Sequence, residues 1–374
     1  MSIEVLNLKT GQKIEKEIKE LGWSVEQATK GGYEHFMLKE ILEQPSAIRR
    51  AIVQDKNLVT DMALDILRAK NVVITACGTS RYAALIGRYL FSKLAKKFCD
   101  VVMASEFQYF ADSIDKNTLV MAVSQSGETA DVMEGVKKAK EYGAKIFSIV
   151  NVVDSSLARI SDNVIYLNCG PEIAVASTKA FVNQLVIFYL LSFAMVNRLG
   201  EAIEKIRKIS HVVQDVIDEN GSKLKEIAEK TKDRNDFYYI GRGINFAMAS
   251  EGALKLKEIS CIHAEGMPAG ELKHGTIALI GSGTPVLAIC PKDYTFHETL
   301  SNAIETKARG AFVIGVSDEN NDAFDEWIKI PGVEEIFYPL VTIIPLQLLA
   351  YYIAVARGKN PDKPKNLAKA VTVK

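Results

Sequence analysis

Hydroxyl side chains crowd one short segment of the chain, Ser124-Gln125-Ser126-Gly127-Glu128-Thr129, which lies between a β-branched run and an amphipathic stretch. A helix amino terminus offers unpaired backbone N–H groups and a partial positive charge, which together bind a phosphate. The hydroxyls add donors, and Gly127 lets the backbone come close. An ordinary helix cap needs one hydroxyl, so the excess favours a phosphate site, joined by Thr79 and Ser80 at a neighbouring turn. Neither Lys nor Arg occurs in the segment, which suggests that the ligand is a phosphate monoester. The sequence contains no Walker loop, so nucleotide hydrolysis is not expected.

A second group of residues has the composition of an acid–base site. In the stretch 251–262, EGALKLKEISCI, Lys255 and Glu258 are three residues apart and share one helix face, while Leu254 and Ile259 are expected to point inward. A solvated ion pair is the ordinary alternative. The loop that follows, residues 263–275, combines two His, two Glu and a Lys with three glycines and a proline. A carboxylate and an imidazole such as His274 suit proton abstraction beside a carbonyl and sugar-ring opening.

The carboxyl-terminal segment, residues 360–374, contains two prolines and has no helical period, so it is expected to be a tail. Its apolar residues Leu367, Ala368, Val371 and Val373 are expected to pin it to the body. A lysine pinned in apolar surroundings can act as a nucleophile towards a carbonyl, but composition alone does not single out Lys369.

These segments must be positioned by regular elements, and an alternation of strands and helices begins at residue 71. Strands are predicted at 71–76, 118–123 and 145–150, with helices after the first two. This rhythm predicts a doubly wound parallel sheet. Ligands of such sheets bind at the carboxyl ends of strands, where the hydroxyl-rich turns lie.

The second half of the chain repeats the first. The strand 237–240 before Gly241 matches the strand before Gly78 at an offset of 163, and 286–289 matches 120–123 at 166. Apolar helices are expected to begin at Gln184 and at Gln347, again 163 apart. We therefore predict two tandem α/β domains of one fold, separated by a polar helical stretch near residues 200–235.

The two halves differ at their turns, which locates the site in the first half. Cys290 stands where the first half has Ser124, so only the first half keeps the polar cradle. The sequence Gly241-Arg242-Gly243 opens like a dinucleotide fingerprint, but Phe246 occupies the third glycine position, and a dinucleotide site is rejected.

Composition excludes several other classes. Lys plus Arg and Asp plus Glu each number 46, giving a formal net charge of zero, which argues against a nucleic-acid partner. The apolar run 185–196 is shorter than the ~18 residues of a membrane span, so no membrane partner is expected. The five cysteines and five histidines are scattered, so neither a metal site nor a disulfide framework is predicted. No cofactor is expected.

The first 45 residues differ from the rest. Residues 3–8 and 13–18 are expected to pair as a hairpin about Thr10-Gly11, and a helix is expected over 35–43 after Gly31-Gly32. We divide the chain into this segment (1–45), two α/β domains (46–215 and 216–360) and the tail (361–374).

Six motifs together resemble one family. They are CGTS (77–80), SQSGETAD (124–131), EIAVASTKAF (172–181), EGALKLKEIS (251–260), AGELKHG (269–275) and NLAKAVTV (366–373). In this order they are similar to the isomerase part of the glucosamine-6-phosphate synthase family, the isomerizing glutamine–fructose-6-phosphate aminotransferases, which carries two tandem sugar isomerase (SIS) domains. The resemblance covers about residues 33–374.

The resemblance implies a role for each matching residue. Ser124, Gln125, Ser126 and Thr129 would hold the phosphate of fructose 6-phosphate, with Thr79 and Ser80 lining the sugar and the backbone near Val175 and Ala368 assisting. His274, supplied by the neighbouring subunit of a dimer, would open the ring, and Lys369 would form a Schiff base at C2 that ammonia attacks. Glu258 would move the proton between C1 and C2, with Lys255 stabilising the intermediate. The products would be glucosamine 6-phosphate or, without ammonia, glucose 6-phosphate.

Two departures from the family pattern stand out. Lys365 replaces the usual Arg, so a bidentate contact would become a single-point one. The glutaminase domain is missing, because residue 2 is Ser and no Cys precedes Cys77. Residues 1–45 then correspond to the end of that domain and a linker, and the chain is expected to be a cytoplasmic isomerase fragment whose full-length form would carry the glutaminase domain.

Two other readings stay open. SIS domains also act as non-catalytic sugar-phosphate sensors, which usually carry a DNA-binding segment and can lack acid–base residues; Glu258, His274 and Lys369 argue against this class. Related SIS deaminases or deglycases share the cradle, but GELKHG and NLAK favour the synthase.

Overall fold

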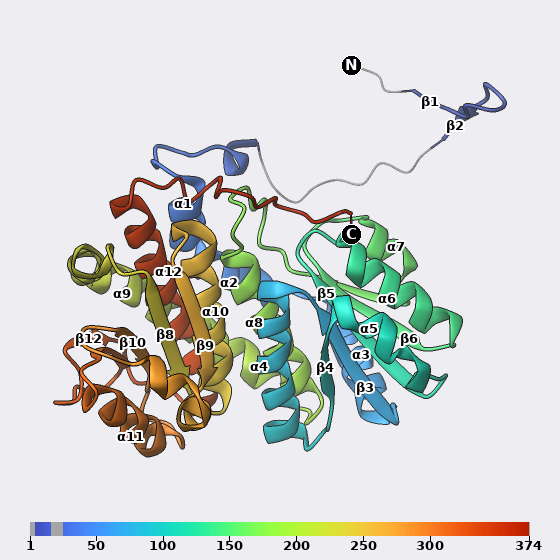
Figure 1. Ribbon diagram of the computed structural model, residues 1–374. Helices are drawn as coiled ribbons and strands as arrows, with labels where there is room; N and C mark the ends of the chain where they lie inside the picture. The colour runs from blue at the N-terminus through green and yellow to red at the C-terminus, as the bar shows by residue number, and fades with distance from the viewer. Residues whose placement is uncertain (1–3, 16–24, 374) are drawn as a thin grey trace.

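The computed structural model describes residues 4–15 and 25–373 and contains two five-stranded parallel sheets with helices between them and outside them (Figure 1). The first half comprises β3 (Asn71–Ala76), β4 (Asp100–Met103), β5 (Thr118–Ser124), β6 (Lys145–Val150) and β7 (Asn163–Tyr166), with α3 (Lys56–Arg68), α4 (Gly78–Ala95), α5 (Ala104–Phe110), α6 (Ala130–Glu141), α7 (Ser156–Ile160) and α8 (Lys179–Ala194). The second comprises β8 (Asp236–Gly241), β9 (His263–Pro268), β10 (Pro285–Ile289), β11 (Phe312–Ser317) and β12 (Glu326–Lys329), with α10 (Ile244–Ser260), α11 (Phe296–Lys307) and α12 (Tyr338–Ala356).

Both sheets have the same strand order. The first runs β4-β3-β5-β6-β7 and the second β12-β11-β10-β8-β9, with every neighbouring pair parallel. Numbered within its own half, each order is 2-1-3-4-5, a doubly wound arrangement. The predicted duplication and fold class are confirmed. The switch of direction lies between β3 and β5 in the first half.

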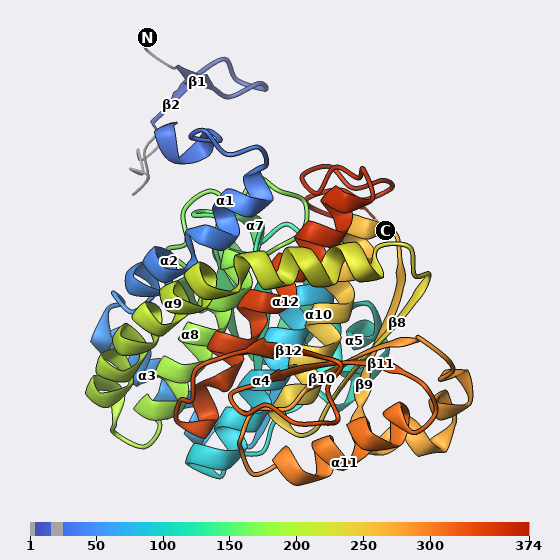
Figure 2. The same ribbon diagram turned by 90° about the vertical axis from the view of Figure 1, so that its left-hand side faces the viewer.

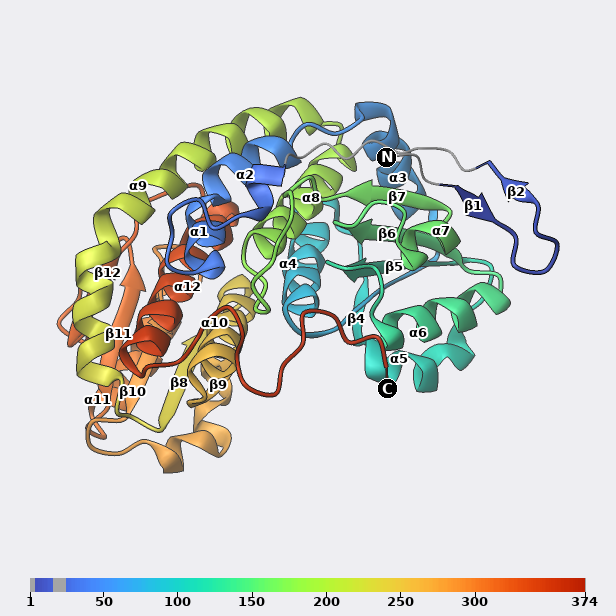
Figure 3. The same cartoon turned by 90° about the horizontal axis from the view of Figure 1, so that it is seen from above.

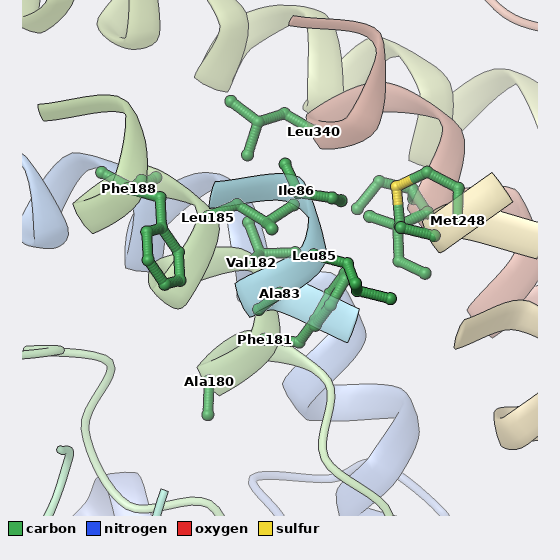
Figure 4. Close-up of a cluster of buried hydrophobic side chains, with 14 of the residues drawn as sticks. Ala83, Leu85, Ile86, Ala180, Phe181, Val182, Leu185, Phe188, Met248 and Leu340 are labelled. Carbon is green, nitrogen blue, oxygen red and sulfur yellow. The ribbon is translucent and has the colours of Figure 1, made fainter. Parts of the chain in front are cut away.

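The core has three parts because both faces of each sheet are covered. Alternate residues of a strand point to opposite faces, so Ile74 and Met121 join a central cluster while Val73 and Val120 pack under α5 and α6. The central cluster is shared by both halves: Leu85 of α4, Phe188 of α8, Met248 of α10 and Leu340 of α12 belong to it (Figure 4). The two halves therefore form one packed body.

The connection between the halves is α9 (Leu199–Thr231), which packs on α2 (Gln44–Ala51), α8 and α12 and runs along one side of the molecule (Figure 2). It confirms the polar helical stretch predicted near residues 200–235. Position 215, where the two domains were divided in the sequence, falls inside this continuous helix.

Two helix starts were predicted wrongly. Gln184 and Gln347 lie inside α8 and α12, which begin at Lys179 and Tyr338. The first residue of α8, Lys179, is charged yet buried, and its ammonium pairs with Glu43 at 2.7 Å. In α12 a proline occupies the first turn, where it is tolerated, and the largely apolar sequence of the helix continues through Pro345. The segment Glu335–Ala356 is long and apolar enough to cross a bilayer, but 83% of its apolar window is buried inside the fold.

The amino-terminal segment contains the predicted hairpin in shorter form. β1 (Val5–Leu6) pairs antiparallel with β2 (Lys13–Ile14), and residues 3 and 16–18 of the prediction lie outside the described residues. The hairpin stands apart from the body (Figure 3). The predicted helix over 35–43 is confirmed as α1 (Phe36–Leu42), whose Met37 and Ile41 are part of the central core.

Candidate active site

Two helix amino termini meet at one pocket in the first half. α4 begins after β3 and α6 begins after the adjacent strand β5, so their free N–H groups face the same edge of the sheet. A cavity of about 220 Å³ lies there. It is lined by Cys77, Gly78, Thr79, Ser80, Val123, Ser124, Gln125, Ser126, Thr129, Val175, Ser177, Glu258, Leu367, Ala368, Lys369, Ala370 and Val371. Ten of the twelve residues proposed from the sequence are in this set.

The segment 124–129 is held in a tight turn by its own hydroxyls. The backbone N–H of Gly127 donates to Ser124 Oγ at 3.0 Å, and the hydroxyls of Ser124 and Thr129 lie 3.0 Å apart. Gly127 has a φ of +66° and packs directly on Ser155. Ser124, Ser126 and Thr129 line the cavity at the amino end of α6, where their neutral hydroxyls could bind a phosphate.

Replacing Gly127 with alanine is expected to weaken both the fold and phosphate binding. The backbone of residue 127 is in the left-handed region, and a Cβ added there would overlap the Ser155 side chain. Gly143 is a matched control, because its φ is +82° but the nearest atom to a new Cβ is 3.6 Å away. Gly143→Ala should cost about 1 kcal/mol from backbone strain, and Gly127→Ala about 1–3 kcal/mol more from overpacking, measured by denaturant unfolding. Equal losses in the two variants would contradict the close approach.

The equivalent place in the second half is filled by the protein itself. The carboxylate of Asp293 accepts hydrogen bonds from Asn245 Nδ2 at 2.8 Å and from both the backbone N–H and the hydroxyl of Thr295 at 2.7 Å. A Cβ on Gly243, which precedes α10, would overlap the Tyr294 hydroxyl. A side-chain anion thus takes the position between β8 and β10, which explains why only the first half retains an open cradle.

α10 carries a row of three ionisable side chains beneath the cradle. Lys255 Nζ lies 2.6 Å from Glu258 Oε2, 3.4 Å from Glu251 Oε1 and 2.9 Å from the Thr79 hydroxyl oxygen. The solvated ion pair is excluded, because Lys255 and Glu251 are completely buried while Leu254 is only half-buried. Of the two residues expected to point inward, only Ile259 does so.

The electrostatics of this row follow from its burial. Burial raises the pKa of Glu251 to about 8 despite the nearby Lys255 ammonium. Burial alone would lower the pKa of Lys255, but Glu251 and Glu258 together raise it above its usual range. Lys255 is therefore a fixed positive charge under the pocket, suited to stabilising negative charge on a substrate oxygen.

Removing that charge is expected to destabilise the protein. Lys255→Met leaves Glu251 and Glu258 without their cation, and breaking a buried pair costs about 3–5 kcal/mol. Lys257 lies on the same helix but is exposed, so Lys257→Met should change the unfolding free energy by less than about 0.5 kcal/mol. Thermal and denaturant unfolding of both variants would test this, and a Lys255→Met protein as stable as the wild type would refute the buried row.

The carboxyl-terminal tail crosses from the second half to the first and closes the pocket (Figure 1). The Val371 carbonyl accepts a hydrogen bond from the N–H of Ala130, in the first turn of α6, at 3.0 Å. Lys369 Nζ lies 2.7 Å from Glu172 Oε2 and donates to the Ala174 carbonyl at 2.8 Å.

The expected apolar anchoring of the tail is wrong. Leu367, Ala368, Val371 and Val373 are all exposed, and polar contacts hold the tail instead. The surroundings of Lys369 are correspondingly polar. Glu172 is fully buried, and although burial would raise its pKa, Lys369 lowers it to about 2.

Two predicted site residues are absent from the lining: Lys255 lies beneath the cradle, and His274 lies elsewhere. It ends the 3-10 turn Ala269–His274, is exposed, and is not among the residues lining the cavity within this one described chain. Across residues 4–15 and 25–373, no three His, Cys, Asp or Glu side chains are close enough together to hold a metal ion.

Three residues of the site were missed in the sequence. Glu172 and Ser177 lie in the motif 172–181 and are linked, since the Ser177 hydroxyl donates to Glu172 at 2.9 Å. Glu251 is four residues before Lys255, a spacing that signals an ion pair on a helix. Only the tertiary packing reveals that this pair is buried.

The fold and the pocket define a tandem doubly wound α/β protein with one open anion cradle. The chain belongs to the SIS domain family, which matches residues 65–194 and 231–357, one match for each sheet.

Three proteins of known name or structure are similar to this chain. The chain is 48% identical to a glutamine–fructose-6-phosphate aminotransferase (isomerizing) of Thermococcus kodakarensis over 100% of its own length, but spans only 64% of that relative. The solved C-terminal domain of glucosamine-fructose-6-phosphate aminotransferase from Francisella tularensis is 36% identical, with a TM-score of 0.83 over 90% of this chain and 100% of that one. A glucosamine-6-phosphate deaminase of Thermotoga maritima, at 24% identity and a TM-score of 0.72 over 90% and 99%, shares the fold.

Proposed function

We propose that this chain converts fructose 6-phosphate and ammonia to glucosamine 6-phosphate through a Schiff base on Lys369. The observation that carries the proposal is one cavity lined by a hydroxyl cradle, a lysine amine and a carboxylate: Ser124 to Thr129, Lys369 and Glu258. The similarity to the isomerizing aminotransferases supports it. Hexosamine synthesis is the corresponding pathway.

The first stage binds the sugar and activates C2. The hydroxyls and N–H groups of 124–129 hold the phosphate, and Thr79 and Ser80 line the sugar. The Lys369 amine attacks the C2 carbonyl, and loss of water gives the imine. In the free protein the Lys369 ammonium is paired with Glu172, so it must leave this pair and lose a proton to solvent before that attack. Ammonia then adds to C2 and releases the lysine, leaving fructosimine 6-phosphate.

The second stage moves one proton. Glu258 removes a proton from C1, the C1–H electron pair forms the C1=C2 bond, and the imine nitrogen takes up a proton, which gives an enaminol. Glu258 then returns its proton to C2, and the C1 hydroxyl loses its proton as it becomes the aldehyde. The Lys255 ammonium, 2.6 Å from Glu258, stabilises negative charge on the intermediate. The backbone near Val175 and Ala368 borders the sugar.

The assembly is also part of the proposal. His274, which is exposed on its own chain, would enter the pocket of a neighbouring subunit and open the sugar ring there, and a homodimer would then be required for activity. A glutaminase domain would supply ammonia in a longer cytoplasmic protein. The Lys365 side chain, in the position of the family's arginine, is exposed on the tail.

A ketose–aldose isomerase that makes only glucose 6-phosphate is the second candidate. It needs Glu258 and the cradle but not transfer of ammonia.

Product analysis separates these functions. The chain is incubated with fructose 6-phosphate and either ammonium or glutamine, and the products are identified by NMR. Glucosamine 6-phosphate from ammonium alone is the expected result. Glucose 6-phosphate alone would support the second candidate, and binding without any product would support a sugar-phosphate sensor.

A further inference from the structure

Glu40, on α1, is a buried carboxylate outside the pocket that no step above uses. It is 2% exposed. Its Oε1 accepts hydrogen bonds from the backbone N–H of Ile173 at 2.5 Å and of Ala174 at 3.3 Å. Its Oε2 is buried without a hydrogen-bond partner among the described residues. A buried carboxyl group with one unpartnered oxygen is costly, so its position calls for an explanation.

The backbone that Glu40 holds is the wall of the pocket behind Lys369. The Ala174 carbonyl and the Glu172 carboxylate both bind Lys369 Nζ, and Val175, the next residue, lines the cavity. The segment 172–175 is therefore fixed by Glu40 on one side and fixes Lys369 on the other.

Asp362 links α1 both to the carboxyl-terminal tail and to the segment 172–175. The Asp362 carboxylate accepts the N–H groups of Phe36 at 2.9 Å and Met37 at 2.8 Å, which caps α1. The Asp362 carbonyl accepts the N–H of Val175 at 3.2 Å. Thus α1 holds both the tail that carries Lys369 and the segment against which Lys369 rests.

We propose that Glu40 is a positioning residue, which sets the place of the Lys369 amine relative to C2 through the segment 172–175. The inference rests on the proposed Schiff-base function. Burial and the negative charge of Glu172 raise the pKa of Glu40, and Lys369 and Lys179, itself paired with Glu43, are the cations near it. The proposed positioning of Lys369 depends on the Glu40 oxygen that accepts hydrogen bonds from Ile173 and Ala174, and it involves no proton transfer by Glu40.

The test compares two substitutions at Glu40. Glu40→Ala removes the acceptor, whereas Glu40→Gln retains an oxygen that can accept both N–H groups. Imine formation is measured by borohydride reduction in the presence of fructose 6-phosphate, with mass mapping of the adduct to Lys369, and the Kd for fructose 6-phosphate is measured separately. Glu34→Ala is the control, since Glu34 precedes the same helix and is exposed.

Glu40→Ala is expected to slow adduct formation about 10- to 100-fold, as a displacement of about 1 Å can do, while the Kd changes less than about threefold because the cradle is untouched. Glu40→Gln and Glu34→Ala should stay within about threefold of the wild type. Wild-type rates in Glu40→Ala, or equally slow rates in Glu40→Gln, would overturn the inference alone. If the wild type forms no adduct at Lys369, the proposed function fails and the inference fails with it.

Glu40→Asp keeps the test decisive if the alanine variant does not fold. Its carboxylate is one methylene shorter and cannot reach both N–H groups from the same helix position. Slow adduct formation with an unchanged Kd supports the inference, and wild-type rates contradict it.

Discussion

Lys369→Arg is expected to eliminate the synthesis of glucosamine 6-phosphate while leaving the protein folded. The guanidinium keeps the positive charge beside the fully buried Glu172, so the ion pair survives, but it cannot form an imine. We expect a loss on the order of 10⁴-fold or more, as for removal of a catalytic nucleophile, measured as product formed from fructose 6-phosphate and ammonium.

Lys363→Arg is the matched control, because Lys363 lies on the same tail, is exposed and is absent from the cavity lining. Its activity should equal that of the wild type. Substantial glucosamine 6-phosphate from Lys369→Arg would exclude the Schiff base at this residue.

Glu258→Gln is expected to separate the two stages of the reaction. The amide occupies the same space beside Lys255 but cannot take a proton from C1, so isomerisation should fall by about 10²- to 10⁴-fold. Binding and imine formation need no carboxylate at this position and should persist. The predicted signature is an adduct on Lys369, trapped by borohydride, without release of either aldose product.

Glu229→Gln serves as the comparison, since Glu229 is an exposed carboxylate on α9 paired with Lys232. It should leave the rate unchanged. If Glu258→Gln retained the wild-type isomerisation rate, another group would have to move the proton.

Much of the scaffold could be predicted because its signals are local. Strands β3 and β6 follow β-branched and apolar runs and begin and end where those runs do. Both faces of a central parallel strand are covered, so such runs are continuous. The cradle could also be predicted, because its hydroxyls lie within six residues of one turn.

The features that escaped prediction depend on contacts between distant segments. Lys255 is buried and Leu254 is only half-buried, the reverse of what the local pattern suggests, because α10 is packed between both halves of the molecule. The tail is fixed by Asp362 and Lys369 through partners more than 190 residues away, which no local apolar pattern reveals. α12 begins nine residues before Gln347, because its first turns lie in the shared core, where prolines and apolar residues satisfy the packing.

A crystal structure with fructose 6-phosphate tests the central claim most directly. The account predicts the phosphate within hydrogen-bond distance of the Ser124, Ser126 and Thr129 hydroxyls, with C2 in contact with Lys369 Nζ and C1 beside Glu258. A sugar phosphate bound elsewhere, for example in the larger cavity of about 1090 Å³ beside Arg49 and Arg50, with the cradle empty, would contradict it.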